Sequence, residues 1–119
     1  MNCIIIDDDD LSRRVIEEFV KRTEYLTLTQ SFSGPVEAIN YLKQGNEIDL
    51  IFLDIEMPEM SGIEFLTTLA RPPQIIIVSS KEKYALEAFE YSVTDYLLKP
   101  VTYARFFKAV NKAFDVFAN

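Results

Sequence analysis

Acidic, hydroxyl and basic side chains follow the apolar runs of this sequence at the points where the runs end. They follow four runs in turn: Asp7 and Asp8, then Asp54, then Ser79, and finally Lys99. Two carboxylates about 4 Å apart repel each other by roughly 4 kcal/mol at an effective dielectric constant near 20. Carboxylates gathered at one place in a fold therefore indicate a bound cation. A small set of oxygen ligands with room for water suits Mg2+.

Asp54 is the best candidate nucleophile, because it closes the apolar run 50–53 and its backbone would be held by that strand. A carboxylate can accept a phosphoryl group as a covalent intermediate, and the transferred group then needs cationic and hydrogen-bonding help at its oxygens. We expect Lys99 and Ser79 to supply that help. Taken singly, a lysine before a proline is usually a surface charge, and a serine after a strand is usually a turn former.

The acidic run continues through Asp9 and Asp10, which we expect to cap the helix that follows, where Asp is favoured. Asp7 and Asp8 differ because they terminate a buried strand. Strict alternation would point these two side chains to opposite faces of a sheet. Both can serve one site only if the strand has already ended.

Short runs of mostly apolar residues are predicted to be strands, at residues 3–6, 26–32, 50–53, 75–78 and 96–98. The first, third and fourth runs are unbroken, which is typical of parallel strands covered on both faces by helices. Amphipathic stretches lie between and after the runs. Their expected core stripes are Leu11, Val15 and Phe19; Val36, Ile39 and Leu42; Ile63, Phe65 and Leu66; Ala85, Ala88 and Phe89; and Tyr103, Phe106, Phe107, Val110, Phe114 and Phe117.

Strands that alternate with helices predict an α/β fold, with a three-layer arrangement of a five-stranded parallel sheet and five helices. In such open sheets the ligand site lies beyond the carboxyl ends of the strands, where the strand order reverses. Because the polar residues described above follow the strands, we expect them to meet at that edge.

The length of 119 residues predicts a single domain. With 12 Lys and Arg against 19 Asp and Glu, the net charge of -7 repels nucleic acid phosphates, so no direct contact with nucleic acid is expected. The lone Cys3 excludes a disulfide scaffold and favours a cytoplasmic location. The apolar runs are too short to cross a bilayer, so no membrane association is expected.

The strand-end residues lie within four motifs, at residues 4–8, 53–58 with Gly62, 78–79 and 95–100. Over the whole chain these motifs resemble the receiver domains of two-component response regulators. Residues 84–90 and 96–100 are similar in particular to receivers that precede LytTR-type DNA-binding domains. The resemblance implies a flavodoxin-like fold with strand order 2-1-3-4-5. It also implies that residues 1–119 are the receiver, with an effector domain following in the full-length protein.

The resemblance implies a role in phosphoryl transfer for each strand-end residue. Asp54 would be the phosphoacceptor, assisted by Lys99 and Ser79. The implied cofactor is Mg2+, and its ligands would be Asp8, Asp54, the backbone carbonyl of Glu56, and Asp7 through a water molecule. Such a domain is not an enzyme beyond phosphotransfer onto its own Asp54 and slow self-dephosphorylation.

The resemblance also implies a conformational switch made by Ser79 and Tyr96, and a cis peptide bond between Lys99 and Pro100. Glu56 and Lys81 would flank the path of the attacking water, where their opposite charges can pair. The implied output surface is formed by the fourth helix, the last strand and the last helix. Phosphorylation would favour a homodimer through this surface, with Tyr91 and Tyr103 as candidate contacts.

The implied partner is a sensor histidine kinase that carries the phosphohistidine, since this chain has no histidine. Two alternatives stay open. A haloacid-dehalogenase-type phosphatase also uses an aspartate, a Ser or Thr, a Lys and Mg2+, but it needs an acidic pair after the Lys, and only Asp115 follows Lys99 here. The other alternative is a receiver that serves as an interaction module without phosphorylation.

Overall fold

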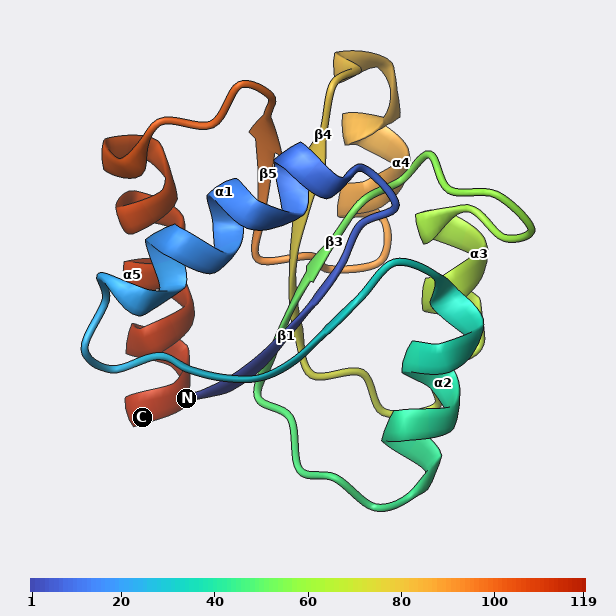
Figure 1. The fold of residues 1–119 in the computed structure, drawn as a ribbon, viewed down its shortest axis with the longest axis horizontal. Helices are drawn as coiled ribbons and strands as arrows, with labels where there is room; N and C mark the ends of the chain where they lie inside the picture. Colours follow the sequence, from blue (N-terminus) through green and yellow to red (C-terminus); the bar gives the residue numbers. More distant parts are fainter.

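Five parallel strands form the central sheet of the computed structural model, which describes residues 1–119 (Figure 1). The strands are β1 (Asn2–Ile6), β2 (Thr27–Phe32), β3 (Leu50–Leu53), β4 (Gln74–Ser79) and β5 (Asp95–Leu98). Their order in the sheet is β2-β1-β3-β4-β5. The predicted strand order and the parallel pairing are therefore confirmed.

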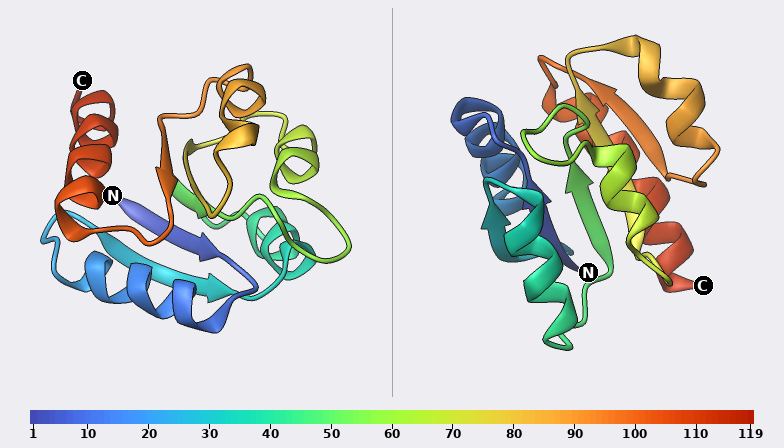
Figure 2. Two further views of the ribbon diagram at one scale, coloured as in Figure 1. Left: turned by 90° about the horizontal axis from the view of Figure 1, so that it is seen from above. Right: turned by 90° about the vertical axis from the view of Figure 1, so that its right-hand side faces the viewer.

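Helices cover both faces of the sheet, which gives the predicted three layers. They are α1 (Asp10–Lys21), α2 (Pro35–Lys43), α3 (Gly62–Thr67), α4 (Ala85–Phe89), which follows the 3-10 turn η1 (Glu82–Tyr84), and α5 (Tyr103–Ala118). Figure 2 shows α1 and α5 on one face and α2, α3 and α4 on the other. None of these helices has the length and the apolar character needed to span a membrane.

The unbroken apolar runs are explained by two separate cores, one on each face of the sheet. In β3, Leu50 and Phe52 pack in the core under α1 and α5, whereas Ile51 and Leu53 pack in the core under α2, α3 and α4. All four side chains are almost fully buried. Successive residues of a strand face opposite sides, so both positions must be apolar when both sides are covered.

The expected core stripes are correct for α3 and partly wrong for the other helices. On α3, Ile63, Phe65 and Leu66 are buried, as predicted. On α1, Leu11 is 72% exposed, and the buried residues are Ile16 and Val20. Leu11 lies in the first turn of α1, where it borders a surface pocket with Ser80 and Pro100.

The last helix also departs from its expected stripe. Phe106 and Val110 are buried, as predicted, but Phe107 and Phe117 are exposed. Ala109 and Ala113 complete the buried face of α5. Alanine side chains let the helix backbone approach the sheet closely. The predicted stripe for this helix includes only its large apolar residues, so it lacks these two alanines.

Candidate functional site

Three carboxylates meet where β1 and β3 end, as the sequence predicts. Ile6 and Leu53 are paired across these two strands, so the next residues, Asp7 and Asp54, lie side by side. The Asp54 amide still donates to the Ile6 carbonyl at 2.9 Å, which fixes its backbone. Because β1 ends at Ile6, Asp7 and Asp8 can both turn toward one site. Carboxylate oxygens of Asp7, Asp8 and Asp54 all lie within 4.8 Å of one another.

This cluster is largely removed from solvent, which makes its charge costly. Asp7 is 2% exposed and Asp54 is 5% exposed, whereas Asp8 lies at the surface. Burial first, and then the nearby Asp7 carboxylate, raise the pKa of Asp54 to about 7, although Lys99 acts in the opposite direction. A divalent cation would offset this repulsion. The donor atoms are all oxygen and one carboxylate is open to water, so the residues present fit Mg2+.

Lys99 joins the cluster from the end of β5. Its ammonium nitrogen lies 3.2 Å from Asp7 Oδ2 and 3.8 Å from Asp54 Oδ1, with the side chain 18% exposed. The Lys99 amide donates to the Ser79 carbonyl at 2.8 Å, which ties the two strand ends together. The peptide bond between Lys99 and Pro100 is cis, as predicted.

Ser79 and Tyr96, the two predicted switch residues, both bind the backbone of Lys81. The fully buried Ser79 hydroxyl accepts a hydrogen bond from the Lys81 amide at 3.1 Å. The Tyr96 hydroxyl donates to the Lys81 carbonyl. The Tyr96 ring points inward, with the residue 9% exposed, and burial raises the pKa of its hydroxyl. The loop after β4 is therefore held by both residues at once.

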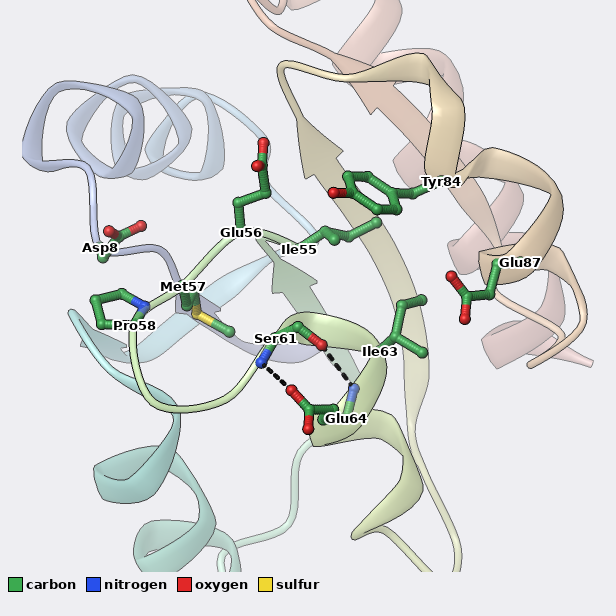
Figure 3. Close-up of a pocket in the computed structure, with 10 residues that line it drawn as sticks. All are labelled: Asp8, Ile55, Glu56, Met57, Pro58, Ser61, Ile63, Glu64, Tyr84 and Glu87. Carbon is green, nitrogen blue, oxygen red and sulfur yellow. Dashed lines mark hydrogen bonds between the residues drawn. The ribbon is translucent and has the colours of Figure 1, made fainter.

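Glu56 and Lys81 are paired beside the cluster, as the sequence analysis expected. Their charged atoms are 3.4 Å apart, and both side chains are partly exposed, at 42% and 49%. Figure 3 shows Glu56 on the loop after β3 and Asp8 on the loop after β1, bordering one pocket of about 540 Å3. At the far end of the β3 loop, Ser61 and Glu64 form a capping box that starts α3 (Figure 3).

Of the remaining acids of the N-terminal run, Asp9 caps α1, as predicted, whereas Asp10 lies in the first turn of the helix. Asp9 accepts a hydrogen bond from the Leu11 amide, and Asp10 pairs with Arg13 at 2.5 Å. Two residues of this helix were missed by the sequence analysis. The Ser12 hydroxyl donates to Asp7 Oδ2 at 2.7 Å, and the Arg13 guanidinium donates to the Asp7 carbonyl at 2.8 Å. The available signal was the helix start at Asp10, which turns the third and fourth helical positions back toward the end of β1.

Tyr103 does not lie on the expected output surface, and that prediction is wrong. Its ring packs against Phe19 and Phe106, and Arg22 lies over it at 3.9 Å. Its hydroxyl lies 3.0 Å from that of Thr23. Tyr103 begins α5 on the side that faces α1, so it stabilises the contact between these two helices. Tyr91, the other candidate, is 41% exposed.

Comparison with known proteins agrees with this geometry. The model of the response regulator receiver domain family matches residues 3–111. An uncharacterized response regulatory protein of Vibrio cholerae is 34% identical over 114 residues, covering 94% of this chain and 48% of the relative. The sensory transduction protein LytR of Staphylococcus epidermidis is 35% identical over 115 residues, covering 94% of this chain and 45% of the relative. The chain thus spans about half the length of these curated relatives.

Solved structures show the same fold. The response regulatory domain of protein mrkE from Klebsiella pneumoniae superimposes with a TM-score of 0.90 at 27% identity, covering 99% of this chain and 98% of that one. A CheY in a CheX-CheY-BeF3-Mg complex from Borrelia burgdorferi has a TM-score of 0.83 at 24% identity, covering 96% of this chain and 89% of that one. At that level of identity, the second likeness shows the fold alone.

The sheet order and the residues at its carboxyl edge define a signalling domain of flavodoxin-like fold. The chain belongs to the response regulator receiver domain family of two-component systems, and its relatives include LytR proteins. The phosphatase alternative gains no support from these matches.

Proposed function

We propose that Asp54 accepts a phosphoryl group from the phosphohistidine of a sensor histidine kinase. The observation that carries this proposal is the position of Asp54, which is buried, is fixed by a backbone hydrogen bond to β1, and belongs to a carboxylate cluster that Lys99 contacts. An Asp54 oxygen attacks phosphorus, and a P–O bond forms as the P–N bond breaks. The electron pair leaves with the partner's imidazole, which then takes up a proton. The chain itself has no histidine.

The other strand-end residues stabilise the transferred group. Lys99 is close enough to turn from Asp7 toward the phosphoryl oxygens, since its nitrogen already lies between the two aspartates. Ser79 reaches a phosphoryl oxygen when its hydroxyl releases the Lys81 amide. Such preorganised donors stabilise the negative charge on the oxygens of the transferred group.

Mg2+ is the cofactor that this oxygen cluster fits. Asp8 and Asp54 would bind it directly together with the Glu56 carbonyl, and Asp7 would bind through water. When bound, the ion neutralises negative charge on the carboxylates and on the phosphoryl oxygens. Asp7 suits an outer position because protein donors already occupy its carboxylate.

The output of the domain is proposed to be a change of its α4-β5-α5 surface. Ser79 and Tyr96 both hold the Lys81 backbone, so a Ser79 hydroxyl drawn to the phosphoryl group must move the loop that leads into α4. Phe89, Tyr91 and Leu98 are 48%, 41% and 44% exposed on this side. Phosphorylation would favour a homodimer through these apolar residues, without direct contact of this domain with nucleic acid.

The kinase is proposed to dock beside the site at the start of α1. Leu11 is 72% exposed there, and it borders a pocket of about 380 Å3 with Val15, Pro100 and Val101. An apolar surface next to Asp54 would place a partner's phosphohistidine within reach of the carboxylate.

The LytR relatives are about twice as long as this chain, and we propose that residues 1–119 act as the receiver domain for a LytTR-type effector domain.

A phosphoramidate assay tests the proposed function, because this small donor carries the same P–N bond as phosphohistidine. The chain is incubated with phosphoramidate and Mg2+ and run on a phosphate-affinity gel. A retarded band that disappears after hydroxylamine treatment, which cleaves acyl phosphates, is the expected result. A chain that is never retarded would support the remaining alternative, an interaction module that works without phosphorylation.

A further inference from the structure

The Asp7 carboxylate is held in place by three donors, and one of them, the Ser12 hydroxyl, is a side chain with no role in the proposed chemistry. Asp7 Oδ1 accepts the Asp9 amide at 2.9 Å, while Oδ2 accepts the Ser12 hydroxyl at 2.7 Å and lies 3.2 Å from the Lys99 nitrogen. Asp7 is 2% exposed. A buried carboxylate oxygen that loses a donor is destabilised, because bulk solvent does not reach it to replace that donor.

The backbone of Asp7 is fixed independently of its side chain. Its amide donates to the Phe32 carbonyl at 3.0 Å, and its carbonyl accepts the Arg13 guanidinium at 2.8 Å. The freedom that remains is rotation of the carboxylate about the side-chain bonds. Ser12 and Lys99 are the groups that restrain Oδ2 against this rotation.

The Lys99 ion pair and the Ser12 hydrogen bond to Oδ2 respond differently when the phosphoryl group is transferred. In the proposed function Lys99 turns toward the phosphoryl oxygens, so Oδ2 loses its cationic neighbour. Ser12 lies in the first turn of α1, takes no part in binding the phosphoryl group, and keeps its hydrogen bond. It then becomes the donor that satisfies Oδ2 in the phosphorylated state.

We infer that Ser12 is a positioning residue that holds the Asp7 carboxylate in place when Lys99 is drawn to the phosphoryl group. The inference rests on the proposed function, because it assigns Lys99 to the phosphoryl oxygens. It predicts that the contribution of Ser12 to ligand affinity depends on whether a phosphoryl group or its mimic is bound. Ser12 should contribute little to the affinity for Mg2+ alone and much more to the affinity for the phosphoryl mimic. A residue that only stabilised α1 would affect both states equally.

The experiment compares wild type with Ser12→Ala by calorimetric titration of Mg2+ alone and of beryllofluoride in the presence of saturating Mg2+. Ser12→Ala should bind beryllofluoride about tenfold more weakly, the factor expected for a hydrogen bond to a charged group. Its affinity for Mg2+ alone should fall by less than about threefold, because Lys99 still restrains Oδ2. Ser12→Thr keeps the hydroxyl and should restore most of the beryllofluoride affinity.

Ser80→Ala is the matched control, since Ser80 borders the same pocket as Ser12 and donates no hydrogen bond to Asp7. A loss of the same size in Ser80→Ala, equal losses of Mg2+ and beryllofluoride binding in Ser12→Ala, or wild-type binding by Ser12→Ala would each overturn the inference. Thermal unfolding of each variant excludes a folding defect. Failure of the proposed function looks different, because the wild-type chain itself would then not bind beryllofluoride with Mg2+.

Discussion

Gly62 lies directly against the backbone of Asp54, and a Cβ at this position would be 2.4 Å from the Asp54 carbonyl oxygen. The Gly62 amide donates to the Ile55 carbonyl at 2.7 Å, which brings the first turn of α3 against the end of β3. The absence of a side chain at residue 62 therefore determines where the phosphoacceptor backbone lies. This close approach explains why the receiver motif has a glycine at this position.

Gly62→Ala should displace Asp54 and lower both stability and phosphorylation. The atoms in the way belong to the backbone, so the loss of unfolding free energy should be about 1 to 3 kcal/mol, as for other overpacked sites. Gly34→Ala is the control, because the nearest atom there is the end of the flexible Glu37 side chain. Urea unfolding and the rate of acetyl phosphate labelling measure the two effects. Equal behaviour of the two variants would show that the close contact is unimportant.

Asp95 is the first residue of β5, at the end opposite Lys99, and it should make the free energy of unfolding depend on pH. It is 4% exposed and is bound by Arg105 at 2.8 and 2.9 Å and by Lys112 at 3.0 Å. Burial raises its pKa, but the hydrogen bonds from Arg105, the Tyr96 amide and Lys112 outweigh burial and hold the pKa of Asp95 well below its usual range. A carboxyl with a depressed folded pKa stabilises the fold fully above its unfolded pKa of about 3.9 and loses this contribution as the pH falls through the folded value.

Asp95→Asn should therefore lower the unfolding free energy at neutral pH by about 1 to 3 kcal/mol, the cost of disrupting a buried hydrogen-bonded group. The difference from wild type should shrink as the pH falls below about 4. Asp115→Asn, an exposed change on α5, is the control and should show almost no difference. A gap between wild type and Asp95→Asn that stays constant down to acid pH would contradict the assignment.

The ion pair between Lys81 and Glu56 should modestly prolong the phosphorylated state, because we expect these two residues to flank the path of the attacking water. A partly exposed pair contributes only about 0 to 1 kcal/mol, so Lys81→Ala should speed hydrolysis of the phosphorylated protein by no more than roughly fivefold. High salt should reduce the difference. Lys83→Ala, which removes a lysine that lies over Tyr84 instead, should leave the lifetime unchanged. Identical decay of Lys81→Ala and wild type at low ionic strength would mean that the pair plays no part in hydrolysis.

Asp8 and Asp10 should differ sharply in their effect on Mg2+ binding. Asp8 belongs to the carboxylate cluster, whereas Asp10 is paired with Arg13 on α1. Asp8→Ala should weaken Mg2+ binding by at least about tenfold, because it removes a charged ligand. Asp10→Ala should change it less than about twofold, since it alters only a distant, screened charge. Calorimetric titration measures both, and similar losses would argue against Asp8 as a direct ligand.

The positions of the site residues were predictable because each one follows a strand. A run of apolar residues marks the strand, and parallel strands bring their carboxyl ends to one edge of the sheet. The sequence pattern therefore places Asp7, Asp8, Asp54 and Lys99 together. The pairing of Glu56 with Lys81 was expected from the resemblance to receiver domains and not from the strand pattern, and the two charged groups are indeed paired.

The contacts made by helices were harder to predict. Which side of α1 faces the sheet depends on where the helix starts and how it crosses the strands, so Leu11 was expected in the core and is exposed. The contacts of Ser12 and Arg13 with Asp7 were missed for the same reason, because they too depend on where α1 starts and how it crosses the strands. Tyr103 was misplaced because the rotation of α5 about its axis depends on packing against α1.

Intact mass spectrometry after incubation with acetyl phosphate tests the central claim most directly. With Mg2+, wild type should gain the mass of one phosphoryl group, while Asp54→Ala should gain none. A chelator should abolish labelling of wild type, because the carboxylate cluster would then lack its cation. Phosphorylation of the Asp54→Ala protein, or labelling of wild type that persists in the chelator, would contradict the account of Asp54 as the Mg2+-dependent phosphoacceptor.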